Sequence, residues 1–143
     1  MSKDEGSWRT VAQVALGAVL ATAGVGHLTF QREEFQAQVP GWVPVDDDVV
    51  VLASGVVEIA LGTALLATWR QPRRAIVGAT VAAFFVAVFP GNIAQLTDRA
   101  DAFGLDTDAK RAVRLLFQPV LVVWALMSTD AVRVWRSRRR ASR

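Results

Sequence analysis

Cysteine is absent from the 143 residues of this chain, and histidine occurs once, as His27. Without cysteine, disulfide frameworks, thiolate metal sites and cysteine nucleophiles are excluded. A single histidine also excludes a metal site built from several histidines of one copy. The sequence contains no glycine-rich phosphate loop and no nucleophile triad. Because the chain has no redox centre of its own, an enzyme that acts alone is the less favoured interpretation.

Charge is missing from four long stretches of the sequence. Charged residues make up 20% of the chain, but they fall almost entirely in the tails and between those stretches. The hydrocarbon core of a bilayer is about 30 Å thick, and a helix needs about 20 apolar residues to cross it. The pattern therefore predicts an all-α, polytopic membrane protein with one domain, residues 1–143. Its bundle of four transmembrane helices is expected at about 11–30, 49–69, 75–96 and 112–128.

The first and last stretches each have an alternative interpretation. The first follows Lys3 and Arg9, as in a secretory signal peptide. It is long, has no convincing small-residue cleavage site and precedes further apolar stretches, so a retained helix is expected. The fourth stretch is short, and we expect Asp106 or Asp108 to cap its start and to extend it.

Lysine and arginine are divided unequally between the two sides of such a bundle. The side with both termini carries eleven, six of them in the tail 129–143, and the other side carries four. By the positive-inside rule, both termini are expected in the cytoplasm, in an N-in/C-in topology. Trp8, Trp69 and Trp135 would mark the inner membrane boundary and Trp42 the outer one. The basic tail is explained by topology and anionic lipid, so no nucleic acid partner is expected.

Each predicted helix carries a polar side chain in its outer half. The set comprises His27, Glu58, Asn92, Arg114 and Gln118, and we expect almost no polar groups in the inner half. A charge near the bilayer centre costs about 2.5–3.5 kcal/mol on insertion scales, so charges there should be paired or should face a wet cavity. We therefore predict an ion pair between Glu58 and Arg114, completed by hydrogen bonds from His27 and Asn92. Gln118 lies one turn after Arg114 on a similar face.

Two interpretations of this polar set stay open. Ionisable groups inside a membrane mark functional sites by default, which favours a ligand pocket. The alternative is that the polar groups only hold the helices together, although such contacts contribute only about 0.6 kcal/mol on average. Pro90 and Pro119 are expected to bend their helices. Small residues should allow close helix approach, namely Gly17, Ala21, Gly55, Gly62, Gly78 and Ala82.

Five blocks of residues follow one another along the chain: Gly24 to His27, Phe35 with Val39 to Pro44, Ser54 to Gly62, Phe89 to Ile93, and Arg114 to Pro119. In these blocks and in their order, the chain resembles the DoxX-like family of small four-helix integral membrane proteins. They extend over most of the chain. In one departure, many relatives have a proline shortly after the histidine, where this chain has Leu28 to Arg32.

The resemblance implies a single DoxX-like transmembrane domain in the bacterial plasma membrane. An arginine-rich sequence with abundant alanine and valine favours the same kind of source. Some family members look like partners of membrane oxidoreductases, including quinone-linked ones. The leading hypothesis is therefore an accessory subunit with a quinone- or lipid-like ligand in an outer-leaflet pocket. In it, His27 and Arg114 donate hydrogen bonds to a quinone carbonyl, and Glu58 holds Arg114 in place.

Two further functions remain as alternatives. A non-enzymatic assembly factor or chaperone for another membrane protein would depend on a lipid-facing surface rather than on a pocket. A small-solute transporter would need a homo-oligomer, because four helices are few, and polar groups that continue to the inner side. We place the transporter last, because such groups are not expected there.

Overall fold

The computed structural model describes residues 3–143, which are all-helical apart from turns and loops. Four helical segments of these residues are long enough and apolar enough to cross a membrane. They correspond to the four predicted stretches, each displaced by only a few residues. The helices are α1 (Lys3–Leu28), α2 (Arg32–Gln36), α3 (Asp47–Ala67), α4 (Arg73–Ala87), α5 (Phe89–Thr97), α6 (Asp108–Ser128) and α7 (Ala131–Ala141).

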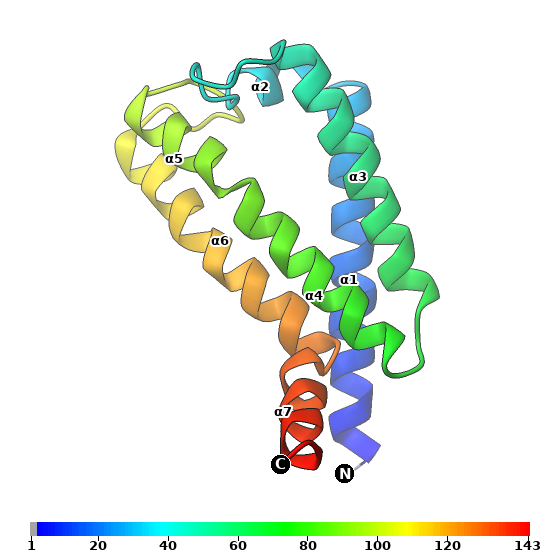
Figure 1. The fold of residues 1–143 in the computed structure, drawn as a ribbon. Coiled ribbons are helices and arrows are strands. Elements are labelled where there is room, and N and C mark those ends of the chain that lie inside the picture. Colours follow the sequence, from blue (N-terminus) through cyan, green and yellow to red (C-terminus); the bar gives the residue numbers. More distant parts are fainter. Residues whose placement is uncertain (1–2) are drawn as a thin grey trace.

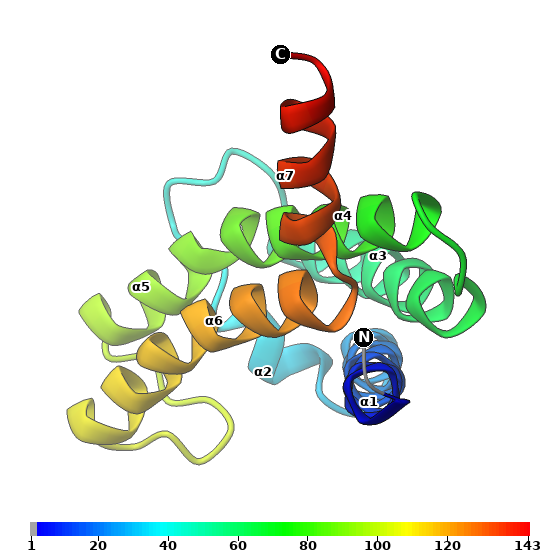
Figure 2. The ribbon, with the colours of Figure 1, turned by 90° about the horizontal axis from the view of Figure 1, so that it is seen from below.

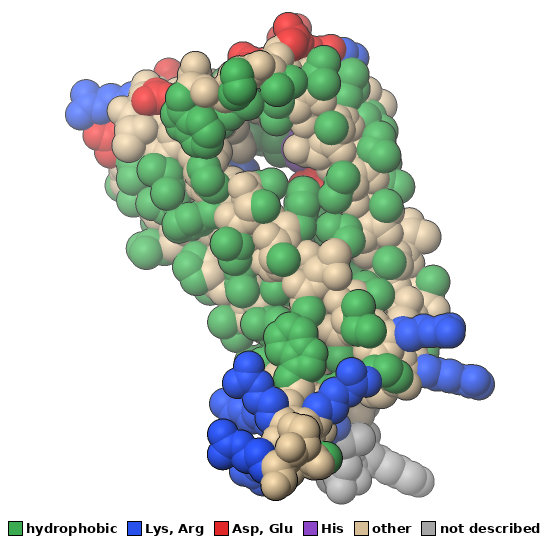
Figure 3. Space-filling view, viewed as in Figure 1, with side chains coloured by type: hydrophobic (Ala, Val, Ile, Leu, Met, Phe, Trp, Pro, Cys, Tyr) green, Lys and Arg blue, Asp and Glu red, His purple; other side chains and the backbone are tan. Residues whose placement is uncertain are grey.

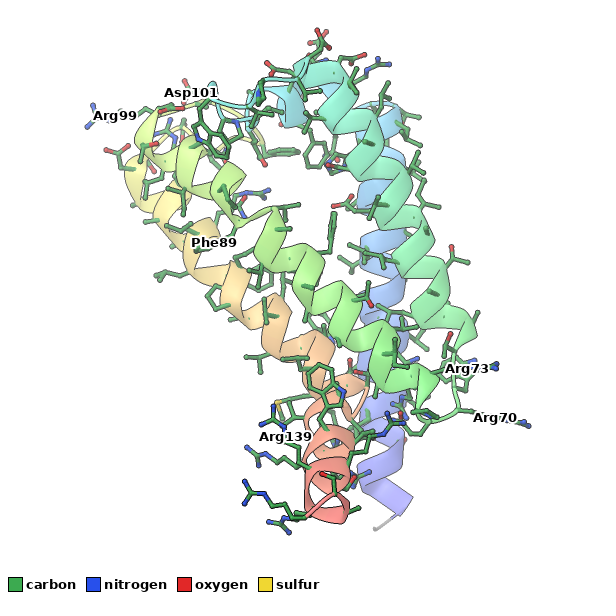
Figure 4. The ribbon with its side chains drawn as sticks, in the orientation of Figure 1. Arg70, Arg73, Phe89, Arg99, Asp101 and Arg139 are labelled. Carbon is green, nitrogen blue, oxygen red and sulfur yellow. The ribbon has the colours of Figure 1, made fainter. Side chains whose placement is uncertain are left out.

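The N- and C-termini lie at one end of the bundle, which we call the terminal end (Figure 1). The opposite end, the loop end, holds α2 and the two longer connections. Arg70, Arg73 and Arg139 project at the terminal end, whereas Arg99 and Asp101 project at the loop end (Figure 4). The termini and their basic residues thus lie at the end opposite the acidic loops, as the sequence predicts.

Helices α1 and α3 pack as a long antiparallel pair, and the N-terminal part of α1 extends beyond α3 (Figure 1). Glycines make this contact possible: a Cβ atom built on Gly24 would lie 2.6 Å from the Gly55 carbonyl oxygen. One built on Gly62 would lie 2.7 Å from the Gly17 carbonyl oxygen. Because the obstructing atoms belong to the backbone, the two helices can approach this closely only without side chains at these positions. The predicted role of the small residues is confirmed here.

The third predicted span consists of two helices rather than one. Helix α4 ends at Ala87, Val88 interrupts it, and α5 begins at Phe89 with Pro90 in its first turn. Proline has no backbone N–H and its ring obstructs the preceding turn, which accounts for the interruption. Pro119, in contrast, lies inside the uninterrupted helix α6.

Helix α6 extends toward the loop end as expected, but its cap differs from the prediction. Its N-cap is Thr107, whose side chain accepts a hydrogen bond from the backbone of Lys110, and neither aspartate has this role. At the terminal end, the basic tail contains helix α7, which starts after Asp130 in a left-handed conformation (φ 60°). Seen from below, α7 extends away from the end of α6 instead of continuing it (Figure 2).

The expectation that the terminal half has almost no polar groups is wrong. Gln13 is fully buried in α1 and donates to the carbonyl oxygens of Leu65 and Thr68 at 2.6 and 3.0 Å. Its own oxygen accepts from Arg74 at 2.6 Å, and Arg74 also donates to the Ser128 carbonyl. This network joins α1, α3, α4 and α6. It was missed because the set of polar residues left out Gln13, which lies only two residues inside the predicted start of the first span.

Candidate functional site

The main cavity of the described residues lies between the α1–α3 pair and the group α4, α5 and α6. Its volume is about 510 Å³, in the range of ligand pockets. The two helix groups separate toward the loop end, and a hollow opens sideways between α3 and α4–α5 (Figures 1 and 3). Acidic and histidine atoms are visible inside it, whereas the outer surface around it is mostly apolar (Figure 3).

All five predicted site residues line this cavity, in two separate groups on opposite walls. His27 and Glu58 occupy the α1–α3 wall, with 2.9 Å between His27 Nδ1 and Glu58 Oε2. The same nitrogen lies 2.9 Å from the Ala23 carbonyl oxygen. A carbonyl can only accept, so a hydrogen bond between these two atoms requires the proton on Nδ1. Among the described residues, Glu58 Oε2 is buried without a hydrogen-bond partner, although it lies beside the ring.

Asn92 and Gln118 form the core of the opposite wall. Asn92 Nδ2 donates to Gln118 Oε1 at 2.9 Å, and Gln118 Nε2 donates to the Phe85 carbonyl oxygen at 2.7 Å. The interruption at Val88 removes helical partners from the last carbonyls of α4, so Gln118 compensates for the broken helix. The two amides thereby bind α6 to the junction between α4 and α5.

Arg114 lies on the same wall, and its predicted ion pair with Glu58 is wrong. Its Nε donates to Asn92 Oδ1 at 3.3 Å, and its Nη2 donates to Gln38 Oε1 at 3.2 Å. Its guanidinium carbon also lies 5.2 Å from the ring centroid of Phe103. Neutral amides and an aromatic face surround this cation, and none of the ion pairs within residues 6–143 includes it. Residue depth placed Arg114 and Glu58 at similar levels, but it did not show that their helices separate at this end.

Aromatic rings roof the cavity at the loop end. Phe35 of α2 stacks on His27 with 3.3 Å between ring centroids, and the edge of Phe103 meets Phe35 at 4.7 Å. Glu34 accepts a hydrogen bond from the backbone of Phe103, which joins α2 to the loop before α6. Arg32 donates to Asp48, and this hydrogen bond raises the pKa of Arg32. The roof is thus fastened to both helix groups.

Sequence reasoning missed Gln38 and Phe103 as parts of the site. Gln38 is buried, and its Nε2 has no partner. It lies in a connection that the depth argument placed outside the membrane. Phe103 stands alone among acidic and small residues of its loop, and an isolated aromatic residue in a polar loop indicates inward packing. Among the described residues, no group of three or more His, Asp or Glu side chains is arranged to hold a metal ion.

The fold and the site together define a class: a small, all-helical protein of multi-pass membrane type, with a laterally open amphipathic pocket near one end. The chain belongs to the family described as a domain of unknown function, DUF8561, whose model matches residues 16–129. No curated protein and no solved structure matches the chain.

Proposed function

We propose that this chain is an accessory membrane protein that holds an amphipathic, quinone- or lipid-like molecule in the outer leaflet. One observation carries the proposal: the cavity places unpartnered polar atoms beside apolar walls and opens toward the bilayer. Its polar groups include Glu58 Oε2 and Gln38 Nε2, both buried without hydrogen-bond partners. Apolar residues such as Leu16, Leu20 and Leu121 line the rest of it.

A buried polar atom without a partner is costly, more so in lipid than near water. Two such atoms in one cavity favour a ligand-binding site, in which the ligand supplies the missing partners. They argue against polar groups that only hold the helices together. An amphipathic molecule suits this site, because its headgroup can satisfy the polar atoms while its chains occupy the apolar part. The lateral opening allows entry from the bilayer without passage through water.

The wider cellular role follows from the sequence. The resemblance to DoxX-like proteins supports a place beside a membrane oxidoreductase of the bacterial plasma membrane. The surplus of arginine at the terminal end supports cytoplasmic termini. Since the chain has no cysteine, labelling can test this topology directly. Ser142→Cys should react with a membrane-impermeant maleimide only in broken cells, whereas Glu33→Cys, on exposed α2, should react in intact cells. The reverse pattern would overturn the orientation.

The binding proposal is tested by filling the cavity. Ser54 lines the cavity on α3, whereas Val56 on the same helix is 59% exposed. Native mass spectrometry of gently extracted protein should show a co-purifying quinone or lipid in the wild type and in Val56→Trp. Ser54→Trp should lose it while remaining folded by circular dichroism. A ligand retained in Ser54→Trp would place binding elsewhere. Wild type without any ligand would overturn the proposal and favour the assembly-factor alternative.

A further inference from the structure

We infer that the molecule bound in this cavity is an aminophospholipid, whose headgroup joins a phosphate to a primary ammonium group. The inference rests on the proposed function, because it names the chemical class of the amphipathic ligand. It follows from the division of the cavity into one wall that donates hydrogen bonds and one that accepts them.

The donating wall consists of Arg114 and Gln38. Among the described residues, the guanidinium of Arg114 contacts neutral acceptors and the Phe103 ring, and no anion is in direct contact with it. Gln38 Nε2 is buried beside it with no acceptor. Arginine and an amide N–H together suit a phosphate, which offers several charged oxygens to such donors. This wall therefore selects an anionic group.

The accepting wall is Glu58. Among the described residues its Oε2 has no hydrogen-bond partner, although it lies 2.9 Å from His27 Nδ1. Glu58 and Arg114 line the same cavity, and among the described residues they do not form an ion pair with each other. A primary ammonium carries both the positive charge and the N–H donors that a buried carboxylate requires. This wall therefore selects a cationic donor.

Other membrane amphiphiles satisfy only one wall. A quinone ring offers carbonyl acceptors and leaves Glu58 without a donor, and a quinol leaves Arg114 without an anion. A choline headgroup has the phosphate, but its quaternary nitrogen has no N–H group to donate. A phosphoglycerol headgroup has hydroxyl donors, but it offers no positive charge to Glu58. Only a phosphate and a primary ammonium in one headgroup supply both opposite charges together with N–H donors for Glu58.

The test compares three phospholipids with identical chains. Delipidated protein in detergent is incubated with equal amounts of phosphatidylethanolamine, phosphatidylcholine or phosphatidylglycerol, and the bound lipid is counted by native mass spectrometry. Wild type should retain the ethanolamine lipid about tenfold more than the choline lipid, because a hydrogen bond to a charged group is lost with choline. Glu58→Gln should abolish this preference, since it removes the charge at nearly constant shape. Arg114→Met should lower retention of both lipids, and Glu33→Gln on exposed α2 should change nothing.

Each other outcome overturns the inference in a recognisable way. Equal retention of ethanolamine and choline lipids would remove the role of Glu58, and stronger retention of the glycerol lipid would exclude an ammonium requirement. A wild-type preference that persists in Glu58→Gln would place the ammonium elsewhere. A quinone retained in place of lipid would refute the inference but support the proposed function. If Ser54→Trp and wild type both retain nothing, the proposed function fails as well.

Discussion

Replacing Gly24 with alanine should loosen the α1–α3 pair by an amount that the structure allows one to estimate. The new Cβ would lie 2.6 Å from the Gly55 carbonyl oxygen and 2.9 Å from the Ile59 backbone nitrogen. Neither atom can move without separating the helices, and overpacking of this kind costs about 1–3 kcal/mol. Alanine also has a higher helix propensity than glycine, by up to about 1 kcal/mol. A control in the same helix removes that second effect.

Gly6→Ala is this control, because a Cβ there has no atom within 4 Å. The difference in unfolding free energy between the two variants should be about 1–3 kcal/mol. That corresponds to a change of about 5- to 150-fold in the unfolding constant. Unfolding by sodium dodecyl sulfate in mixed micelles, followed by circular dichroism, measures both variants. If they agree within about 0.5 kcal/mol, the pair is not held at the distance described and the reasoning fails.

Three further predictions concern individual polar side chains. Gln118→Leu should destabilise the protein by about 1–3 kcal/mol in the same unfolding assay, because it leaves the Phe85 carbonyl and the Asn92 amide without their partner. An unchanged midpoint would show that these groups find other partners. Trp124→Phe removes the indole hydrogen bond to the Ala12 carbonyl at 2.8 Å and should cost about 0.5–1.5 kcal/mol; a gain in stability would contradict this. Lys110 donates a hydrogen bond to Asp106, and this bond lowers the pKa of the Asp106 carboxyl. The stabilisation by this pair is therefore present above the ordinary aspartate pKa, and it is lost as the pH falls through the lowered pKa. Lys110→Met should move the pKa of Asp106, followed by carboxyl NMR, back up toward the ordinary value, and an unmoved titration would refute the assignment.

The four spans could be predicted because a bilayer tolerates few charges, so their absence from a stretch of about 20 residues is a strong signal. The same argument placed the five site residues near one end, and all five line the cavity. The interruption at Val88 was less visible, since Pro90 indicated a bend but not a separate helix. The fourth span was predicted to end at 128, where α6 ends, and its start extends outward to Asp108 as its acidic flank indicated. The choice of Thr107 as cap depended on local backbone geometry.

The pairing of the charges could not be predicted, because depth along a helix says nothing about which neighbour its side chain faces. Glu58 lies beside His27 because Gly24 and Gly55, which have no side chains, allow α1 and α3 to approach closely. Arg114 is kept away from Glu58 because its helix packs with α4 and α5 instead. Gln13 shows the same limit, since an uncharged amide in an apolar stretch gives no sign that it fastens helices at the terminal end.

The sideways opening of the cavity determines how affinity for this protein should be expressed. A ligand that enters between α3 and α4 comes from the two-dimensional solution of the leaflet, where its concentration is a mole fraction rather than a molarity. Adding buffer to such a sample leaves the mole fraction of the ligand in the leaflet unchanged. Adding inert lipid lowers that mole fraction. The fraction of pockets that hold a ligand should therefore follow the lipid composition of the membrane. A change in that composition should alter this fraction directly, with no change in the aqueous phase.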